Sequence, residues 1–288
     1  MAILPSYCCE SMIQPFLKAG MDVQFYPVFR DRVEYPYDNN ADVVLLIDFF
    51  GYTVSQNVEI ACEARRAGKI VIYDATHKID GNPAVEAFAD YSFCSFRKWF
   101  YCNYAKAVKH DGDFADLPQL SSHERYEVLR DEAAREKKAY IAGRTDYKEG
   151  FLENFHAAEE MLERDYLGYA GKPVTPDLRD ILAKRRENAA YLIRELRHVP
   201  EIVLWRDSLD SADAPLFVPV LVDSLVRAEL RSALIQEKIY CPIHWPKSPC
   251  HGDCNELYDM ELSLICDQRY SLKDMARMVG AIQKFFNR

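Results

Sequence analysis

The chain has 288 residues, of which 49% are hydrophobic, and a net charge of −9 at pH 7. That is enough apolar material for one large domain with or without a smaller appendage, while the negative charge argues against general binding to a nucleic-acid backbone and still allows a local basic pocket for one phosphate. No apolar run reaches the roughly 18 residues of a membrane span, Met1–Tyr7 does not resemble a signal peptide, and the nine cysteines are expected to be reduced thiols of a cytoplasmic protein.

The first 110 residues alternate between strand and helix patterns. Strands are predicted at Ala2–Leu4, Val23–Val28, Val43–Ile47, Lys69–Tyr73 and Tyr91–Phe96, and helices at Ser11–Ala19 and Asn57–Ala67. Gly20 and Gly68 follow the two helices, as glycines that end a helix do. Repeated strand–helix–strand units predict an α/β domain with a mostly parallel sheet, and the continuous apolar run at Val43–Ile47 predicts a strand covered on both faces.

The remaining chain is first helical and then mixed. Long helices are predicted at Ser122–Lys138, Tyr147–Arg164 and from Thr175 to about His198; residues 201–288 predict strand, strand, helix, strand, loop, strand and helix, with the clearest strands at Phe217–Val222 and Met260–Ile265 and a closing helix at Leu272–Phe286. We therefore predict a large α/β domain at 1–172 and a small α+β domain, with its linking helix, at 173–288.

The most informative segment runs from Ile70 to Phe100. It reads as a buried strand that ends in Asp74, an irregular stretch with His77, and a second strand that ends in Arg97-Lys98. An acid and a lysine at two strand ends suit pyridoxal phosphate, because the lysine amine forms a Schiff base with the cofactor aldehyde and the carboxylate pairs with the protonated pyridine nitrogen. Ligands of parallel sheets bind outside the carboxyl ends of the strands, so Tyr7, Phe49–Tyr52, Asp74 and Lys98 are expected to converge there.

Several motifs in order carry a family resemblance that spans nearly the whole chain. They are Leu4-Pro-Ser-Tyr-Cys-Cys9 with Pro15–Gly20, Phe49-Phe-Gly-Tyr52, Tyr73-Asp-Ala-Thr-His77, Ser92-Phe-Cys-Ser-Phe-Arg-Lys-Trp99, Ala183–Asn188, Ile239–Pro246 and Asp267-Gln-Arg-Tyr270. Together they resemble the DegT/DnrJ-type aminotransferases, which have the type I fold of pyridoxal-phosphate enzymes and are best known for making amino sugars on nucleotide carriers.

The resemblance implies a role for each matching residue. Lys98 would hold pyridoxal phosphate and move the proton, Asp74 would pair with the pyridine nitrogen, and His77 would lie near the phenolic oxygen. Ser92 or Ser95, expected on the same side of their strand, would serve the phosphate or position the lysine; Tyr7 would stack on the ring or line the pocket; His244 and Arg269 would face the substrate. The resemblance also implies a homodimer that moves an amino group from an amino-acid donor, commonly glutamate, to a keto acceptor, by analogy a nucleotide-linked keto sugar.

Two departures from the family pattern leave alternatives open. Family members usually carry an additional N-terminal segment with a glycine-containing turn that cradles the phosphate at a helix N-terminus, and the glycine-rich turn after the lysine is replaced by Cys102-Asn-Tyr-Ala105. We therefore expect an incomplete phosphate cup. The alternative function is a truncated or non-catalytic aminotransferase-fold protein with a structural or regulatory role, and a third hypothesis is another pyridoxal-phosphate reaction, such as dehydration.

Each of these residues also has a purely structural interpretation. Lys98 could be a surface lysine after a strand, Asp74 a helix cap or the start of an Asx turn, and His77 a solvated loop residue. Ser92 and Ser95 could simply fill the sheet, and Tyr7 could belong to the core. Arg185-Arg186 could be a solvated helix face or pair with carboxylates, and Arg269 could form an inter-domain salt bridge. The loop with Cys250, His251 and Cys254 contains zinc-ligand types, but the spacing is not that of a paired motif, so no metal is predicted.

Overall fold

The computed structural model of the chain describes residues 1–115, 121–164, 167–168, 176–248 and 255–287. The strands are β1 (Ala2–Pro5), β2 (Val23–Tyr26), β3 (Val43–Ile47), β4 (Ile70–Asp74), β5 (Tyr91–Ser95), β6 (Ala105–Lys109), β7 (Ser121–Ser122), β8 (Leu167–Gly168), β9 (Val203–Leu204), β10 (Val218–Leu221) and β11 (Glu261–Leu264). The α-helices are α1 (Glu10–Lys18), α2 (Gln56–Arg66), α3 (Pro83–Glu86), α4 (Glu124–Ile141), α5 (Lys148–Arg164), α6 (Leu178–Leu196), α7 (Ser224–Gln236), α8 (Leu257–Met260) and α9 (Leu272–Phe286). Short 3₁₀ turns lie at Phe49–Gly51, Phe96–Lys98 and Thr145–Tyr147.

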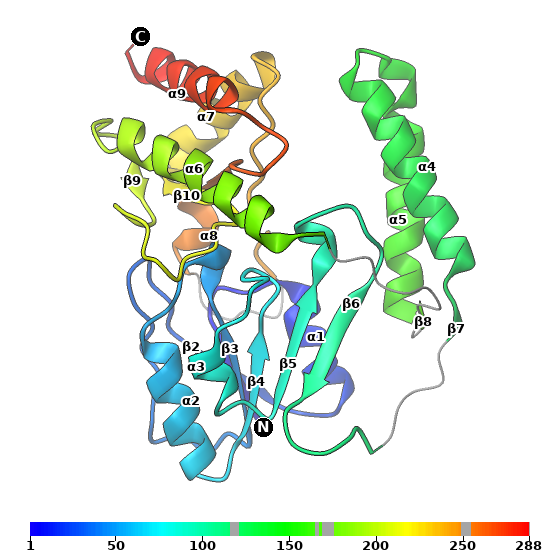
Figure 1. Ribbon diagram of the computed structural model, residues 1–288, viewed down its shortest axis with the longest axis vertical. Helices are drawn as coiled ribbons and strands as arrows, with labels where there is room; N and C mark the ends of the chain where they lie inside the picture. Colours follow the sequence, from blue (N-terminus) through cyan, green and yellow to red (C-terminus); the bar gives the residue numbers. More distant parts are fainter. Residues whose placement is uncertain (116–120, 165–166, 169–175, 249–254, 288) are drawn as a thin grey trace.

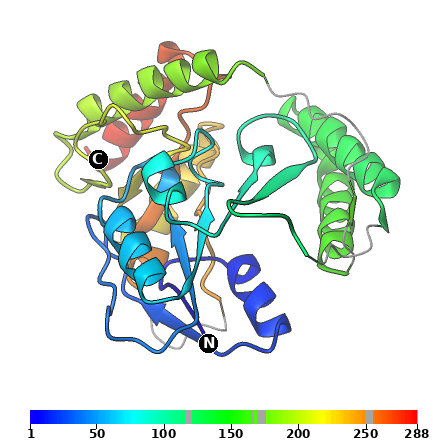
Figure 2. The same ribbon diagram turned by 60° about the horizontal axis from the view of Figure 1, so that its bottom comes forward.

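A six-stranded sheet in the order β2-β1-β3-β4-β5-β6 organises the first half of the chain. Its neighbouring strands are parallel except for β6, which pairs antiparallel with β5. The connection from β1 to β2 runs toward one edge of the sheet, and the connections from β3 to β4 and from β4 to β5 run toward the other edge. Because crossovers between parallel strands are right-handed, the connecting helices must lie on opposite faces of the sheet. Figures 1 and 2 show α1 on one face and α2 and α3 on the other. The carboxyl ends of β1 and β3 thus form a switch point, where sheets of this kind bind ligands.

The two helices before β2 and β4 end as their sequences predict. After α1 and α2 the chain enters the left-handed region at Gly20 (φ 73°) and Gly68 (φ 75°). The residues that follow turn back onto the last helical carbonyls, with Met21 N donating to Phe16 O at 3.0 Å and Lys69 N donating to Ala64 O at 3.0 Å. Because a side chain is disfavoured at positive φ, glycine at these positions fixes where each helix stops.

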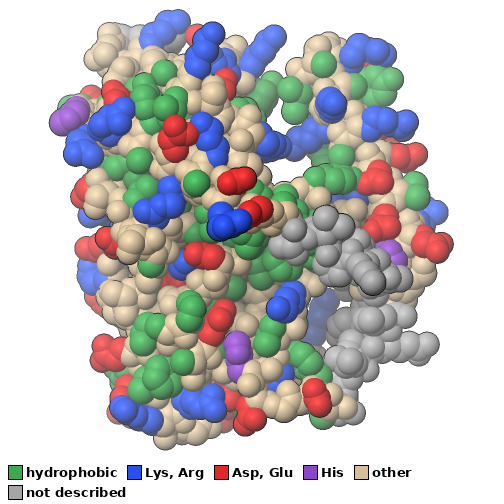
Figure 3. Space-filling view, viewed as in Figure 1, with side chains coloured by type: hydrophobic (Ala, Val, Ile, Leu, Met, Phe, Trp, Pro, Cys, Tyr) green, Lys and Arg blue, Asp and Glu red, His purple; other side chains and the backbone are tan. Residues whose placement is uncertain are grey.

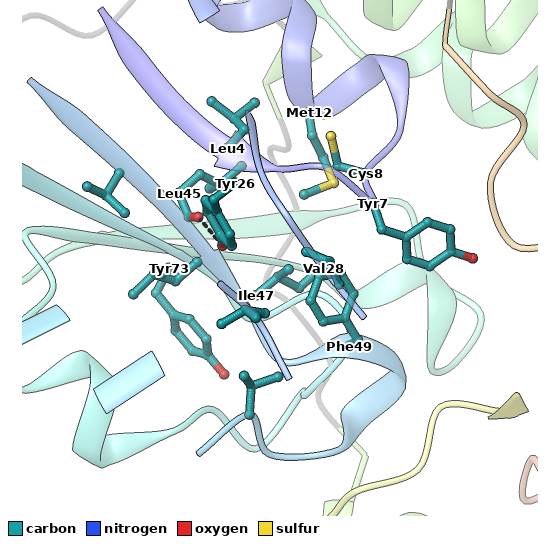
Figure 4. Close-up of a cluster of buried hydrophobic side chains, with 14 of the residues drawn as sticks. Leu4, Tyr7, Cys8, Met12, Tyr26, Val28, Leu45, Ile47, Phe49 and Tyr73 are labelled. Atoms are coloured by element: carbon teal, nitrogen blue, oxygen red, sulfur yellow. Dashed lines mark hydrogen bonds between the residues drawn. The ribbon is translucent and has the colours of Figure 1, made fainter. Parts of the chain in front are cut away.

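The apolar side chains form two buried clusters. The larger one lies in and beside the six-stranded sheet, where Leu4, Tyr26, Leu45 and Tyr73 pack together (Figure 4). The smaller one joins α6, α7 and α9 to the antiparallel sheet β11-β10-β9. Trp205, Trp245 and Tyr258, from the C-terminal half, pack into the larger cluster, so the two halves share buried surface. The predicted domain boundary at 172/173 lies outside the described residues and stays a prediction.

The C-terminal region differs from the prediction at one strand. The strand expected between α7 and the following loop does not form, and residues 237–248 have no regular secondary structure. The closing helix α9 has the predicted bounds, Leu272–Phe286, and begins with a capping box in which Ser271 and Asp274 satisfy each other's main-chain N–H groups.

The hairpin of α4 and α5 stands beside the body as an arm (Figures 1 and 2). It is joined to the region around Lys98 by an ion pair from Arg97 to Glu159 (2.6 Å) and by a hydrogen bond from the Tyr101 hydroxyl to Asp131. On the face in Figure 3, acidic and basic side chains are interspersed over both body and arm. Among the described helices, none is long and apolar enough to span a membrane.

A buried carboxylate fixes the end of β3. Asp48 is 0% exposed and accepts four hydrogen bonds, to Oδ1 from Val54 N (2.9 Å) and Asn57 Nδ2 (3.0 Å) and to Oδ2 from the Tyr73 hydroxyl (2.9 Å) and Asn82 Nδ2 (2.9 Å). Burial raises the pKa of Asp48, although these hydrogen bonds oppose the shift. One side chain thereby connects β3, α2, β4 and the loop that follows His77.

We expect Asp48→Ala to lower the free energy of unfolding by roughly 4 kcal/mol, because it leaves several buried donors without an acceptor. Urea denaturation of the parent and the variant measures the difference. Glu63→Ala, which removes only an exposed ion pair with Arg66, is the control and should change stability by less than about 0.5 kcal/mol. Equal, small effects of the two changes would contradict the role given to Asp48.

Candidate active site

The carboxyl ends of β1, β4 and β5 open onto one cavity of about 650 Å³. Its polar side contains Cys9, Ser11, Asp74, Thr76, His77, Ser92, Ser95, Arg97 and Lys98, with Trp245 beside them. Its other side is apolar and runs over the sheet at Val43, Leu45, Ile70, Ile72, Tyr91 and Phe93 to α1. Of the strand-end residues expected to converge, Asp74 and Lys98 line this cavity, whereas Tyr7 and Phe49–Tyr52 are not among its lining residues; His77 lies beside Asp74 and Lys98.

Asp74 is the last residue of β4 and is 4% exposed. Its Oδ1 atom accepts a hydrogen bond from Thr76 N at 2.8 Å, in the turn that leaves the strand. Burial raises the pKa of the Asp74 carboxyl, and the contacts to Thr76 and the charge of Lys98 lower it in part. A buried carboxylate that borders the cavity suits a cationic ring nitrogen.

Lys98 ends the 3₁₀ turn that follows β5, and its residue surface remains accessible from the cavity. Its Nζ atom lies 3.5 Å from Nε2 of His77. Removal of the amine from bulk water lowers the pKa of Lys98, and Arg97 acts in the same direction, while Cys9 and Asp74 oppose the shift. A lysine with a lowered pKa has more of its amine in the nucleophilic, unprotonated form at neutral pH.

His77 and His244 meet although they are 167 positions apart. Their Nε2 atoms are 2.8 Å apart, and Nδ1 of His77 accepts a hydrogen bond from the main-chain N–H of Phe50 at 3.1 Å. Trp245 stacks on His77 with ring centroids 5.2 Å apart and an interplanar angle of 17°. Burial lowers the pKa of both histidines well below the ordinary value, so both are neutral at pH 7. The solvated-loop interpretation of His77 is thereby excluded.

The two predicted serines do not face the same side of their strand. Side chains alternate along a strand, so residues three apart point to opposite faces. Ser92 shares its more buried face with Cys94, and its hydroxyl contacts Nε2 of His110 at 2.9 Å. Ser95 lies on the other face, and its N–H donates to the Thr76 hydroxyl at 3.2 Å. Both still border the cavity, so their roles toward a phosphate stay predictions.

Three predicted residues, Tyr7, His244 and Arg269, are not among the described residues that line the cavity, although His244 contacts His77. Tyr7 is fully buried, with its ring 4.9 Å from that of Trp245. Arg269 forms a two-point ion pair with Asp267, at 3.0 and 2.6 Å, and its side chain is 73% exposed. Their roles toward the cofactor and substrate stay predictions, and the structure itself gives Tyr7 a place in the core and Arg269 a neighbouring partner.

The residues that hold the lysine segment were not recognised in the sequence. Trp99, next to Lys98, donates from Nε1 to Thr76 O at 2.8 Å. Arg185, 2% exposed, lies over the Trp99 ring at 4.7 Å and donates to Gln268, whose amide donates to Trp99 O at 2.7 Å. The interpretation of Arg185 as a solvated residue is therefore wrong. Its only sequence signal was its place in the motif at 183–188, since its partners Gln268 and Leu216 lie 83 and 31 positions away.

The cavity suits the ring and the aldehyde of pyridoxal phosphate better than it suits the phosphate. Asp74 and Lys98 are the donor set that a protonated pyridine ring and an aldehyde require, and both border the same cavity. For the phosphate, the described lining offers the hydroxyls of Ser11, Ser92 and Ser95 and the charge of Arg97, but no glycine at which the main chain could approach closely.

The cysteine- and histidine-containing loop with Cys250, His251 and Cys254 lies outside the described residues. Elsewhere in the described chain, no cluster of three histidine, cysteine or acidic side chains could hold a metal ion.

Comparison with known proteins supports the fold. Solved structures similar to this chain include a DegT DnrJ EryC1 StrS aminotransferase from Brucella abortus (15% identity, TM-score 0.66, covering 100% of this chain and 79% of that chain), NtdA from Bacillus subtilis with bound cofactor PMP (14%, 0.67, 100% and 68%), and DesI in the presence of its TDP-sugar product (15%, 0.62, 100% and 75%). No protein-family model and no curated protein sequence matches the chain. The predicted fold, that of type I pyridoxal-phosphate aminotransferases, is confirmed.

Glu261 anchors the loop that presents His244. The residue is 0% exposed; its Oε2 accepts from the main-chain N–H of His244 at 2.9 Å and its Oε1 from the Ser263 hydroxyl at 2.5 Å. Burial raises the pKa of Glu261 from 4.5 to about 7, while these hydrogen bonds and Arg227 lower it. The side chain therefore titrates close to neutral pH.

We expect Glu261 to weaken folding as the pH rises. Its pKa is higher in the folded than in the unfolded chain, so the folded state keeps the proton between about pH 4.5 and pH 7 and loses roughly 3 kcal/mol of stability across that window. Glu261→Gln keeps an acceptor for His244 N but does not titrate. Denaturation at pH 4.5 and pH 8 should therefore give a smaller pH-dependent loss in the variant. An identical pH dependence in both proteins would show that Glu261 has an ordinary pKa.

Proposed function

We propose that this protein is a pyridoxal-phosphate-dependent aminotransferase that passes an amino group from an amino-acid donor to a keto acceptor, a nucleotide-linked keto sugar. One observation carries the proposal. Asp74 ends β4 and Lys98 follows the neighbouring parallel strand β5, and both side chains border a single cavity in which His77 lies 3.5 Å from the lysine amine. Similar structures contain the cofactor PMP in one case and a TDP-sugar product in another, which supports this cofactor and substrate class.

When bound, the cofactor supplies an aldehyde for covalent attachment and a ring that withdraws electrons. Lys98 would hold the cofactor and carry the proton during transfer, for which a lowered pKa is favourable. Asp74 would pair with the pyridine nitrogen and favour its protonated form. His77 would serve the phenolic oxygen, Ser92 and Ser95 would serve the phosphate or position the lysine, and His244, on the loop anchored by Glu261, would contact the substrate.

The second candidate is a non-catalytic protein with the same fold. It is favoured by one observation, which is the lack of a glycine-bearing phosphate cradle among the described residues of the cavity. Homodimerisation and a cytoplasmic location, like the roles of Tyr7 and Arg269, stay predictions.

The decisive experiment is to add pyridoxal phosphate to the purified parent protein and to Lys98→Ala. The parent should develop an absorbance band near roughly 410–430 nm that the variant lacks, because the lysine amine is the attachment point. Borohydride reduction followed by peptide mapping should then find the cofactor on Lys98.

Lys106→Ala is the matched control, since Lys106 is an exposed lysine on the neighbouring strand β6. It should behave as the parent does. A parent that shows no band with excess cofactor, or a band that survives in Lys98→Ala, would overturn the proposal, and the first of these outcomes would favour the non-catalytic protein.

A further inference from the structure

The hydrogen bond between His77 and His244 has a direction that the surrounding main chain decides. In a bond between two imidazole nitrogens, one nitrogen carries the proton and the other supplies the lone pair. The rings lie at 78° to each other with centroids 4.5 Å apart and Nε2 atoms 2.8 Å apart. The two neutral rings must therefore have complementary states at these atoms.

Phe50 determines which ring is the donor. A main-chain N–H can only donate, and that of Phe50 points at Nδ1 of His77 at 3.1 Å. Nδ1 of His77 therefore holds a lone pair, and a neutral His77 carries its proton on Nε2. Nε2 of His244 must then accept, so His244 carries its proton on Nδ1.

The Phe50 amide is held in this direction by an unusual turn. Phe50 and Gly51 both have positive φ, 57° and 87°. Their carbonyls accept from Leu216 N and Ala214 N, each at 2.8 Å. A Cβ atom on Gly51 would lie 1.8 Å from Ala214 O, so only glycine permits this approach. The segment 214–216 thus holds the turn, and Tyr52 N, which donates to Phe49 O at 2.9 Å, holds the peptide unit that carries the Phe50 N–H.

We propose that the Phe50 N–H makes His77 and His244 a one-way, neutral hydrogen-bond pair, in which His77 turns a proton-bearing nitrogen toward Lys98 and cannot accept the lysine's proton. Phe50 and His244 are then positioning residues that act on Lys98 through His77. The charged or titratable groups that face Lys98 are Cys9, Asp74, Arg97, His77 and His244. Of these, the two histidines are excluded as proton acceptors by the direction of the chain.

The tautomers themselves do not depend on the proposed function, which enters only through the role of Lys98. They can be read from long-range ¹H–¹⁵N NMR spectra of protein labelled at its seven histidines and measured without cofactor. We expect the Nε2–H form for His77 and the Nδ1–H form for His244, both unchanged between pH 6 and pH 8 because burial keeps both rings neutral. An Nδ1–H form, a tautomer mixture or a cation at His77 would overturn the proposal.

A pair of variants tests the direction of the chain on His244 alone. In His77→Gln, the amide oxygen can accept from Phe50 N and the amide nitrogen can donate to His244, so His244 should keep its Nδ1–H form. In His77→Leu, that donor is lost and the His244 signals should shift toward the Nε2–H form. The same His244 tautomer in both variants would contradict the inference.

Gly51→Ala tests the role of the turn. It should displace the Phe50 amide and convert His77 to a mixture of tautomers, whereas Gly68→Ala, which also places alanine at positive φ but meets no atom within 4 Å, should leave His77 unchanged. If Gly51→Ala does not fold, the glutamine and leucine variants still decide. If the protein binds the cofactor but the two histidines have other tautomers, this inference is wrong and the proposed function stands. If the histidines have the expected tautomers but the protein binds no cofactor, only the proposed function is wrong.

Discussion

The close approach of Phe50-Gly51 to residues 214–216 is the constraint on which the arrangement of the site depends. It joins the end of β3 to the segment that leads into β10, through two main-chain hydrogen bonds of 2.8 Å that require a glycine at position 51. The same turn aims an N–H group at His77. The contact between the two halves of the chain and the hydrogen bonding of the site are therefore set by one piece of backbone, which a side chain at Gly51 would push apart.

A second connection supports the lysine from the opposite direction. Arg185 is buried and donates to Gln268 and to the carbonyl of Leu216, while its guanidinium lies over Trp99. Arginine suits this place, because its planar group can stack on a ring and donate in several directions at once. A displacement of α6 would therefore shift Trp99 and the neighbouring Lys98 through these contacts. Binding in the cavity could shift the C-terminal half through the same contacts.

Burial shifts the titration of five groups in or beside the site toward the neutral form. The pKa values of Asp74 and Glu261 are raised and those of His77, His244 and Lys98 are lowered, each chiefly by removal from water. Such clusters occur at functional sites because a proton can be gained or lost there near neutral pH. The groups of this site differ in their ability to gain or lose a proton. The imidazoles of His77 and His244 are held as neutral hydrogen-bonding groups, whereas Lys98 and Glu261 remain able to titrate.

Local patterns in the sequence predicted five strands of the large sheet and the residues at their ends, but not the sixth strand, β6. Strong local signals explain this success, since apolar runs such as Val43–Ile47, glycines after helices and the capping residues of α9 act within a few positions of the chain. Local patterns also placed Asp74, His77 and Lys98 at carboxyl ends of strands, where sheet topology makes side chains converge. The prediction of a strand after α7 was wrong, because an apolar run alone does not show whether a partner strand lies beside it.

How these residues are held became visible only once the chain was folded. The burial of Arg185, the pairing of His77 with His244, the anchoring of the His244 loop by Glu261 and the ion pair of Arg269 with Asp267 depend on burial and chain geometry that spacing does not reveal, and most of these contacts join residues far apart in the sequence. The tautomer of His77 depends on the direction of a single main-chain N–H group. No pattern of residue types encodes that direction, because it is set by the positive φ angles of Phe50 and Gly51 and by the segment that packs against them.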